Sequence, residues 1–348
     1  MIFTRIVHIL YLEQVFEYEG RTVYVQEIIG LLEEWKNEEH RKPLILQGAR
    51  QVGKTYAILE FGRTHYENVA YFNFETNPKL NETFEENISP DYLIPILSHS
   101  AGQTIVTEKT LIVFDEIQLC ERALTSLKYF YEERPDYHII VAGSLLGVAV
   151  NRARFSFPVG KVDMKTLYPM DLEEFMIAMG EKSLVDQIKK CFETNEPMPS
   201  ALHDAAMQLY RQYLVVGGMP ECVMQFAETR DYILIRHTQD TILASYLNDM
   251  SKYNNLNEIK KTRLAYDNIT VQLSKKNTRF QYKLIKKGGR ASEFENAIEW
   301  LCLSGIVSQV YKVEQIRKPL ENYRDIDAFK ILCVGFGIIV CKERYCGK

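Results

Sequence analysis

The alternation of apolar and polar positions predicts strands separated by helices in the first half of the chain. Helical spacing of apolar residues predicts helices at 25–37, 55–63 and 123–133. Short apolar runs predict buried strands at residues 43–47, 69–74, 111–114, 138–142 and 161–167. Because buried strands that alternate with helices form parallel sheets, we expect an α/β domain over residues 25–180 with helices on both faces of its sheet. Residues 1–24 fit no pattern and are assigned to an N-terminal extension of uncertain structure.

The second half of the chain has a different pattern. Asp171 and Glu174 form a capping box for a helix through Met179. Helical spacing without strand alternation continues to about residue 253, with breaks at 197–199 and 217–220, so we place a domain boundary near residue 181 and a helical region at 181–255. Helical spacing at 259–273 and 291–303, followed by strand alternation at 306–313, predicts a winged-helix-like segment over 256–315. Residues 316–348 are expected to begin a further domain.

Composition narrows the class of protein. Apolar residues make up 46% of the 348 residues, which excludes wholesale disorder. The seven cysteines are scattered without a C-x-x-C pair, as is typical of reduced thiols in the cytoplasm. There is no apolar run long enough to span a membrane, and no signal peptide is recognised at the N-terminus. The sequence therefore predicts a cytoplasmic protein without a membrane partner.

Positive charge is concentrated in residues 251–290. This stretch holds eleven Lys or Arg and two acidic residues, Glu258 and Asp267, although the whole chain has a net charge of −4. A basic winged helix commonly contacts phosphates, so the stretch is a candidate nucleic-acid surface. The alternative is an ordinary solvated basic face, or one that docks on the acidic remainder of the chain.

The strongest chemical motif has the pattern G-x-x-x-x-G-K-T, placed between a predicted strand and a predicted helix. Its residues are Gly48, Ala49, Arg50, Gln51, Val52, Gly53, Lys54 and Thr55. Backbone N–H groups of such a loop and the helix N-terminus can cradle phosphates, with Lys54 reaching the β- and γ-phosphates and Thr55 ligating Mg²⁺. A chance glycine turn before a helix is the alternative. The motif predicts binding of ATP with Mg²⁺.

Two further strand ends carry candidate residues for this chemistry. The apolar run 111–114 ends in Asp115 and Glu116, a Walker B pattern. Asp115 would hold Mg²⁺, and Glu116 would polarise an attacking water as general base, although a helix-capping acid pair has the same sequence pattern. Ser144 follows the strand at 138–142 and is a candidate sensor of the γ-phosphate or, alternatively, a helix N-cap.

The motifs together resemble a known family. They include Asn73-Phe74-Glu75, Phe114 to Gln118, Ala142-Gly143-Ser144, Tyr168-Pro169, Gly217 to Glu221 and Ala297 to Leu301, besides the glycine loop. This series resembles the prokaryotic AAA-like ATPases fused to a C-terminal domain of unknown function, over roughly residues 25–330. The resemblance implies a sheet with an extra strand between the P-loop strand and the Walker B strand, and a central winged-helix-like segment.

Two departures from the family pattern are visible. Members usually continue into a nuclease-like α/β region, which Cys333 to Gly337 replaces here, so the resemblance implies a truncated C-terminus. Gly160-Lys161 stands where the family often has Gly-Arg, which keeps the charge and loses the bidentate fork.

These observations lead to a Mg²⁺-dependent ATPase as the main hypothesis. Arg152 or Arg154 is a candidate arginine finger that would act on a neighbouring subunit of a homo-oligomer, and a solvated loop is the alternative for both. A second hypothesis is a nucleotide-gated switch or DNA-binding adaptor with little or no hydrolysis. A third is a non-functional remnant of a longer gene.

Overall fold

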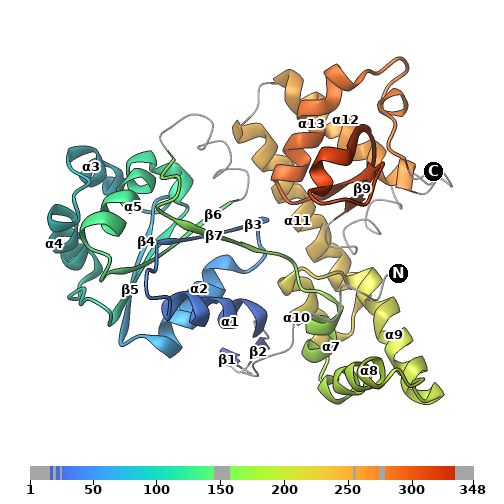
Figure 1. Ribbon diagram of the computed structural model, residues 1–348, viewed down its shortest axis with the longest axis horizontal. Helices are drawn as coiled ribbons and strands as arrows, with labels where there is room; N and C mark the ends of the chain where they lie inside the picture. The colour runs from blue at the N-terminus through green and yellow to red at the C-terminus, as the bar shows by residue number, and fades with distance from the viewer. Residues whose placement is uncertain are drawn as a thin grey trace. The chain divides into compact units, whose positions relative to one another are not determined.

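A computed structural model describes residues 16–18, 21–23, 26–144, 157–253, 256–273 and 279–333. The chain divides into two compact units, Met1–Tyr168 and Pro169–Lys348 (Figure 1). Each unit is described by itself below.

The first unit is built on a five-stranded parallel sheet with the strand order β4-β5-β6-β3-β7. The strands are β3 (Leu44–Gly48), β4 (Asn68–Asn73), β5 (Thr110–Asp115), β6 (His138–Ser144) and β7 (Asp163–Leu167). Strand β6 lies between β3 and β5, so the extra strand between the P-loop strand and the Walker B strand is confirmed. The predicted α/β fold is confirmed with it.

Helices cover both faces of this sheet (Figure 1). The helices are α1 (Gln26–Lys36), α2 (Lys54–His65), α3 (Lys79–Glu86), α4 (Pro90–Ala101) and α5 (Glu121–Glu133), with a short 3₁₀ turn η2 (Ile117–Leu119) before α5. Leu44 and Leu46 pack with α1 and α2, whereas Ile45 belongs to the core beneath α3, α4 and α5. This division follows from the strand period of two, which sends neighbouring side chains to opposite faces.

The parallel register brings the carboxyl ends of the strands to one edge of the sheet. Gly48 pairs with Ser144 on one side and with Leu167 on the other, and Asn73 pairs with Asp115. Helix α2 begins at Lys54, directly after the loop that leaves β3. Residues that are distant in sequence therefore meet at this carboxyl edge.

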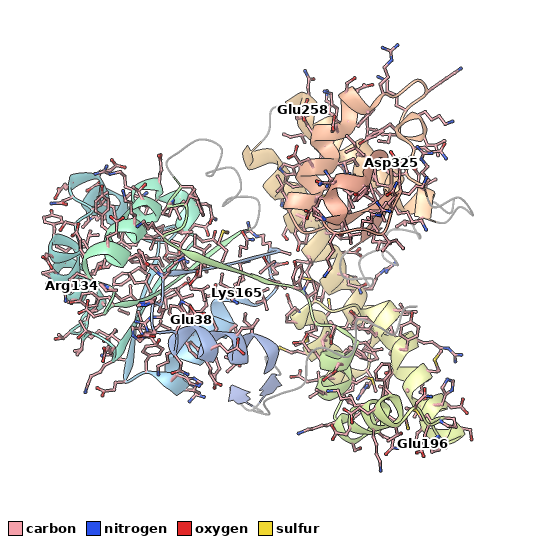
Figure 2. The ribbon with its side chains drawn as sticks, viewed as in Figure 1. Glu38, Arg134, Lys165, Glu196, Glu258 and Asp325 are labelled. Atoms are coloured by element: carbon pink, nitrogen blue, oxygen red, sulfur yellow. The ribbon has the colours of Figure 1, made fainter. Side chains whose placement is uncertain are left out.

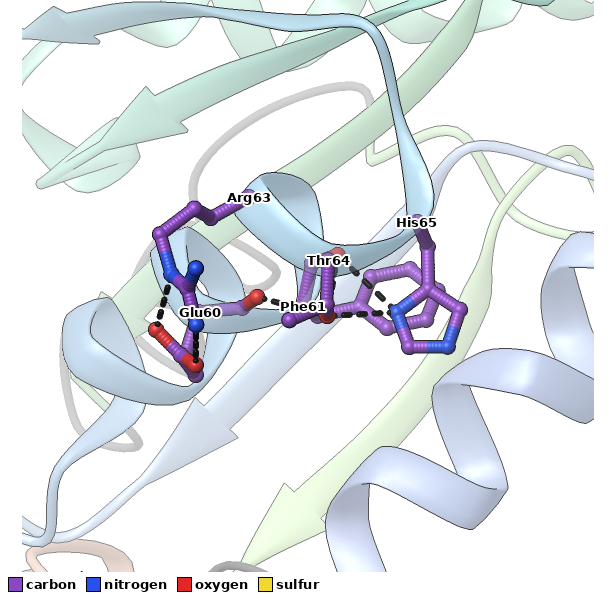
Figure 3. Close-up of polar contacts among 5 residues, drawn as sticks. All are labelled: Glu60, Phe61, Arg63, Thr64 and His65. Atoms are coloured by element: carbon purple, nitrogen blue, oxygen red, sulfur yellow. Dashed lines mark hydrogen bonds and ion pairs between the residues drawn. The ribbon is translucent and has the colours of Figure 1, made fainter. Parts of the chain in front are cut away.

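Hydrogen bonds among the residues of the C-terminal turns of α2 stabilise the opposite end of this helix (Figure 3). Arg63 donates to both carboxylate oxygens of Glu60, at 3.0 and 2.6 Å, and the Thr64 hydroxyl donates to the Glu60 carbonyl at 2.9 Å. The two ring nitrogens of His65 lie 3.2 Å from the Phe61 carbonyl oxygen and 2.7 Å from a carboxylate oxygen of Glu33 on α1. The last turn of α2 is thus tied to itself and to α1.

The remaining described parts of the first unit are small. Strands β1 (Phe16–Tyr18) and β2 (Arg21–Val23) form an antiparallel pair within the N-terminal extension. Across both units, the described cysteines, Cys120, Cys191, Cys222 and Cys302, form no disulfide. No helix in the described ranges has the length and apolar character needed to cross a bilayer.

The second unit starts with α7 (Leu172–Ala178), whose capping box is formed as predicted. The Asp171 carboxylate accepts from the Glu174 N–H at 2.9 Å, and the Glu174 carboxylate accepts from the Asp171 N–H at 3.0 Å. The helices that follow are α8 (Lys182–Thr194), α9 (Ser200–Val216), α10 (Pro220–Thr229) and α11 (Tyr232–Tyr253). The breaks before and after α9 fall at the predicted Pro and Gly positions, whereas the break between α10 and α11 at Arg230 and Asp231 was not predicted.

The chain then forms two helices and a hairpin, marked in Figure 2 by Glu258 and Asp325. The elements are α12 (Leu256–Leu273), η3 (Tyr282–Leu284), α13 (Ala291–Leu303), β8 (Val307–Val313), η4 (Leu320–Tyr323) and β9 (Arg324–Cys333). Strands β8 and β9 are antiparallel, and the Phe280 N–H donates to the Phe329 carbonyl of β9 at 2.9 Å. This order matches the predicted helices and strand, and the winged-helix assignment itself stays a prediction.

Candidate nucleotide and metal site

The glycine loop at the end of β3 adopts a conformation that its sequence permits. A Cβ atom on Gly48 would lie 2.4 Å from the Leu167 carbonyl oxygen, so a side chain there would collide with the backbone of β7. Gly53 has φ 91°, in the left-handed region that glycine adopts without steric cost, and Gln51 lies in the same region with φ 62° although its side chain makes that region less favourable. The loop therefore turns back over the carboxyl edge and leads into α2.

Lys54 is held inside this loop. Its ammonium group donates to the carbonyl oxygens of Gly48 and Ala49, at 3.1 and 2.8 Å. Burial lowers the pKa of Lys54 to about 8, and the nearby carboxylates of Glu116 and Asp115 oppose that shift. The charge is thus costly to keep in place, and an anion bound here would stabilise it.

The N-terminus of α2 is open. In the described structure no side chain caps it at Gly53, and its first turn has no acidic residue. The first N–H groups of a helix have no intrahelical acceptor and carry partial positive charge. Together with Lys54 they offer donors of the kind that bind phosphate.

Thr55 and Asp115 meet across the carboxyl edge. The Thr55 hydroxyl donates to Asp115 Oδ2 at 2.9 Å, and the Asp115 side chain is buried. Among the described residues, no cluster of three His, Cys, Asp or Glu could hold a metal ion. The hydroxyl and the carboxylate suit Mg²⁺, which usually takes one or two protein oxygens together with substrate phosphates and water.

Glu116 follows Asp115 in the left-handed region, with φ 54°. Its N–H donates to Asp115 Oδ1 at 2.9 Å, and its carboxylate accepts from the Gln118 amide. Burial raises the pKa of Glu116, with Asp115 and Glu75 adding to the effect and Gln118 and Lys54 opposing it. A carboxylate with a raised pKa accepts a proton more readily, which suits a general base.

The other predicted site residues fall in different places. Ser144 is the last residue of β6, and its backbone pairs with Gly48 at the carboxyl edge. Arg152 and Arg154 lie outside the described residues. Lys161 precedes β7, so it lies toward the amino edge of the sheet, where its ammonium contacts a carboxylate oxygen of Glu132 at 2.9 Å. The structure does not bring Lys161 to the P-loop of its own chain.

Sequence reasoning missed two residues that contact the acids. Tyr71 of β4 donates its hydroxyl proton to Asp115 Oδ2 at 2.7 Å, and Gln118 donates to Glu116. In the sequence alone, Tyr71 looks like another apolar residue of the predicted strand 69–74. The signal was present in the alternation, because Tyr71 and Asn73 share a face of β4 and Asn73 pairs with Asp115.

Comparison with known proteins agrees with this geometry. Residues 40–176 match the family described as an AAA domain. Residues 207–343 match a domain of unknown function (DUF8612), so the resemblance to AAA-like ATPases fused to such a domain is confirmed. No protein among curated sequences matches the chain. The AAA match supports an ATPase-type nucleotide-binding function.

One solved structure supports the fold, and two others resemble it more loosely. The Walker-type ATPase PABY2304 of Pyrococcus abyssi has 13% sequence identity and a TM-score of 0.55, over 90% of this chain and 94% of that one. The Aeropyrum pernix ORC1 protein in complex with DNA has 13% identity and a TM-score of 0.33, over 91% and 90%. The RuvB Holliday junction branch migration motor of Thermotoga maritima has 14% identity and a TM-score of 0.34, over 81% and 87%. The first of these shows a P-loop ATPase fold, and the other two superpose too loosely to add to it.

Proposed function

We propose that this chain binds ATP with Mg²⁺ and hydrolyses the bond between its β- and γ-phosphates. The supporting observation is the hydrogen-bonded arrangement of Thr55, Asp115 and Glu116 beside Lys54 at the open N-terminus of α2. A phosphate-binding loop, a metal-binding pair and a base thus lie at one edge of one sheet.

Each group has a role that follows from its position. The N–H groups of residues 48–55 and the Lys54 ammonium would hold the phosphates. Thr55 and Asp115 would hold Mg²⁺, which supplies neutralisation of phosphate charge when bound. Glu116 would take a proton from the attacking water, and Ser144 would sense the γ-phosphate from the end of β6.

Substitution Glu116→Gln tests the assignment of the base. The amide cannot take a proton, so we expect phosphate release to fall roughly 100-fold or more while ATP binding is retained. Glu132→Gln is the matched control, because Glu132 is bonded to Lys161 toward the amino edge and should turn over ATP at the wild-type rate. Wild-type turnover in the Glu116 variant would remove Glu116 as the base, and absent turnover in the wild-type protein would leave the switch hypothesis.

A second function, contact with nucleic acid through residues 251–290, is supported by one surface of the second unit. Lys260, Lys261 and Lys286 line a hollow of about 400 Å³, together with Glu258 of α12 and Glu293 and Phe294 in the first turn of α13. Lys261 and Lys286 are paired with Glu258 and Glu293, at 2.8 and 3.2 Å. Exposed cations with no ion-pair partner in the described parts of the chain are Lys260, Arg263, Lys283, Lys287 and Arg290. Such a surface would attract phosphates without reading bases.

Helix α13 is a poor candidate for this contact. In a helix-turn-helix the second helix enters the major groove, and α13 would take that place. Its exposed residues include Glu295 and Glu299, whose charges would repel phosphates on both sides of a groove. The proposed contact is therefore made by α12 and residues 283–290.

The salt dependence of binding to a short DNA duplex tests this second function. If Lys260, Lys287 and Arg290, which have no ion-pair partner in the described residues, each neutralise one phosphate, log K should fall with log salt with a slope of about −3, and Lys260→Ala with Lys287→Ala should reduce that slope by about 2. Glu295→Gln with Glu299→Gln is the control and should not weaken binding. Absence of binding at low salt would end the nucleic-acid proposal, and phosphate release measured with and without the duplex would show whether the two functions are coupled.

A further inference from the structure

Two hydroxyl groups from different elements meet at one oxygen of Asp115. Thr55 on α2 and Tyr71 on β4 both donate to Asp115 Oδ2, at 2.9 and 2.7 Å. The other oxygen, Oδ1, accepts from the Glu116 N–H at 2.9 Å. Three donors therefore fix the plane and the rotation of this carboxylate.

The direction of the Tyr71 proton is set by a chain of contacts behind it. The Asn73 side-chain oxygen accepts from the N–H groups of Glu75 and Thr76, at 2.8 and 3.0 Å, which fixes the orientation of its amide. Its Nδ2 consequently faces Tyr71 and donates to the phenol oxygen at 3.2 Å. With that oxygen accepting from Asn73, the single phenol proton points to Asp115.

The Thr55 hydroxyl then has its lone pairs available. Its one proton is directed to Asp115 Oδ2, so its lone pairs face away from the carboxylate. A Mg²⁺ ligand must present a lone pair in a fixed direction, because Mg²⁺ demands a near-octahedral arrangement. The orientation of Thr55 depends on a carboxylate that stays in place.

We infer that Tyr71 is a positioning residue of the metal site, which holds Asp115 so that Thr55 presents a lone pair to Mg²⁺. The inference rests on the proposed ATPase function. Tyr71 acts through Asp115 and has no assigned contact with the nucleotide. Partners of this kind, one step behind the metal ligands, change metal affinity by 10- to 100-fold when removed.

Substitution Tyr71→Phe removes the hydroxyl and keeps the ring. We expect the Mg²⁺ concentration that half-saturates ATP binding to rise 10- to 100-fold, as measured by calorimetric titrations over a series of Mg²⁺ concentrations. ATP affinity in EDTA should stay at the wild-type value, because the loop amides and Lys54 are unchanged. Turnover at saturating Mg²⁺ should approach the wild-type rate.

Tyr92→Phe is the matched control, because it removes a phenol hydroxyl that is bonded to a different carboxylate, that of Glu86. It should leave the Mg²⁺ dependence unchanged. A wild-type or lower Mg²⁺ requirement in Tyr71→Phe would overturn the inference, the lower value meaning that Tyr71 competes with a metal-bound water. If the wild-type protein binds ATP without any Mg²⁺ dependence, the proposed metal site itself is wrong. That result differs from one in which the wild-type protein depends on Mg²⁺ and Tyr71→Phe has the same half-saturating Mg²⁺ concentration.

Discussion

The two edges of the central sheet in the first unit both bury titratable groups, and the two sets differ in what surrounds them. At the amino edge, burial lowers the pKa of His138 to about 3, with Arg41 and Lys36 adding to the shift. At the carboxyl edge, burial lowers the pKa of Lys54 to about 8. The stronger perturbation is therefore at the edge without a candidate site.

At the amino edge, His138 is buried among aromatic side chains. His138 Nδ1 lies 2.7 Å from the Tyr66 hydroxyl, and the Trp35 indole donates to the Lys42 carbonyl at 2.7 Å. The His138 ring packs edge-on against Tyr66 and Trp35. A perturbed pKa here records burial within a packed cluster.

The carboxyl edge differs in its backbone as much as in its side chains. Gln51, Gly53 and Glu116 have positive φ, α2 starts without a side-chain cap, and Lys54 is bonded to carbonyl groups of its own loop. These donors have partners that phosphate oxygens could replace. Polar groups whose partners a ligand can replace, and not the size of a pKa shift, distinguish a binding site from a packed core.

The largest expected difference between the edges is in ATP affinity, when one lysine is removed from each edge. Lys54→Ala should lower ATP affinity about 100-fold or more, because charge-assisted hydrogen bonds to phosphate are lost. Lys36→Ala should leave ATP affinity unchanged and lower stability by about 1 kcal/mol, because Lys36 lies 4.4 Å from the centre of the Tyr66 ring. Calorimetric titration and urea unfolding measure the two effects. Equal loss of ATP affinity in both variants would contradict the division between the edges.

The effect of acid on the free energy of unfolding should distinguish the two edges by a smaller amount. Burial lowers the pKa of His138 in the folded protein to about 3, from its ordinary value of 6.5. Between pH 6.5 and pH 3, the unfolded chain therefore binds a proton at this residue and the folded chain does not. Stability should fall with acid by up to about 1.4 kcal/mol per pH unit from this group. In His138→Phe with Tyr66→Phe, the loss between pH 7 and pH 5 should be about 2 kcal/mol smaller, as measured by urea unfolding. An unchanged acid slope would show that His138 does not titrate in this way, and ATP affinity at neutral pH serves as the control.

The pH dependence of ATP binding should show the smallest effect, at the carboxyl edge. Lys54 loses its proton near pH 8 in the free protein, and phosphate favours the charged form. ATP affinity should therefore fall above pH 8, by up to about tenfold per pH unit, and binding at pH 8 to 9 should take up a proton. Titration calorimetry in two buffers with different ionisation heats measures that uptake. Affinity that stays constant to pH 10 would mean that Lys54 remains charged without nucleotide.

The apolar periodicity predicted the scaffold closely. Residues 291–303 were expected as a helix and α13 has those bounds, while the expected helix 25–37 is α1 at Gln26–Lys36. Both helix predictions are accurate because the spacing of apolar residues on the buried face of a helix can be recognised within the segment itself. The strand expected at 161–167 starts at Asp163, because the Lys161 N–H closes a turn on the Pro158 carbonyl at 3.0 Å before the strand begins.

The contacts of the site were harder to foresee than its motif. The loop and the acids follow from spacing, whereas Tyr71 and Gln118 depend on strand order and on a turn after Glu116. The alternation places Tyr71 on the same face as Asn73, but it does not show that the Tyr71 hydroxyl reaches Asp115. Register between distant strands, which no local pattern records, decides which side chains meet.

The bond from the Glu116 N–H to Asp115 Oδ1 links two tasks through a single peptide group. An ion that draws the Asp115 carboxylate toward itself also pulls on the peptide that aims the Glu116 side chain. In the proposed ATPase, this bond would couple the position of the metal ligand Asp115 to the orientation of the base Glu116, so that the base would be correctly oriented only when the metal is bound.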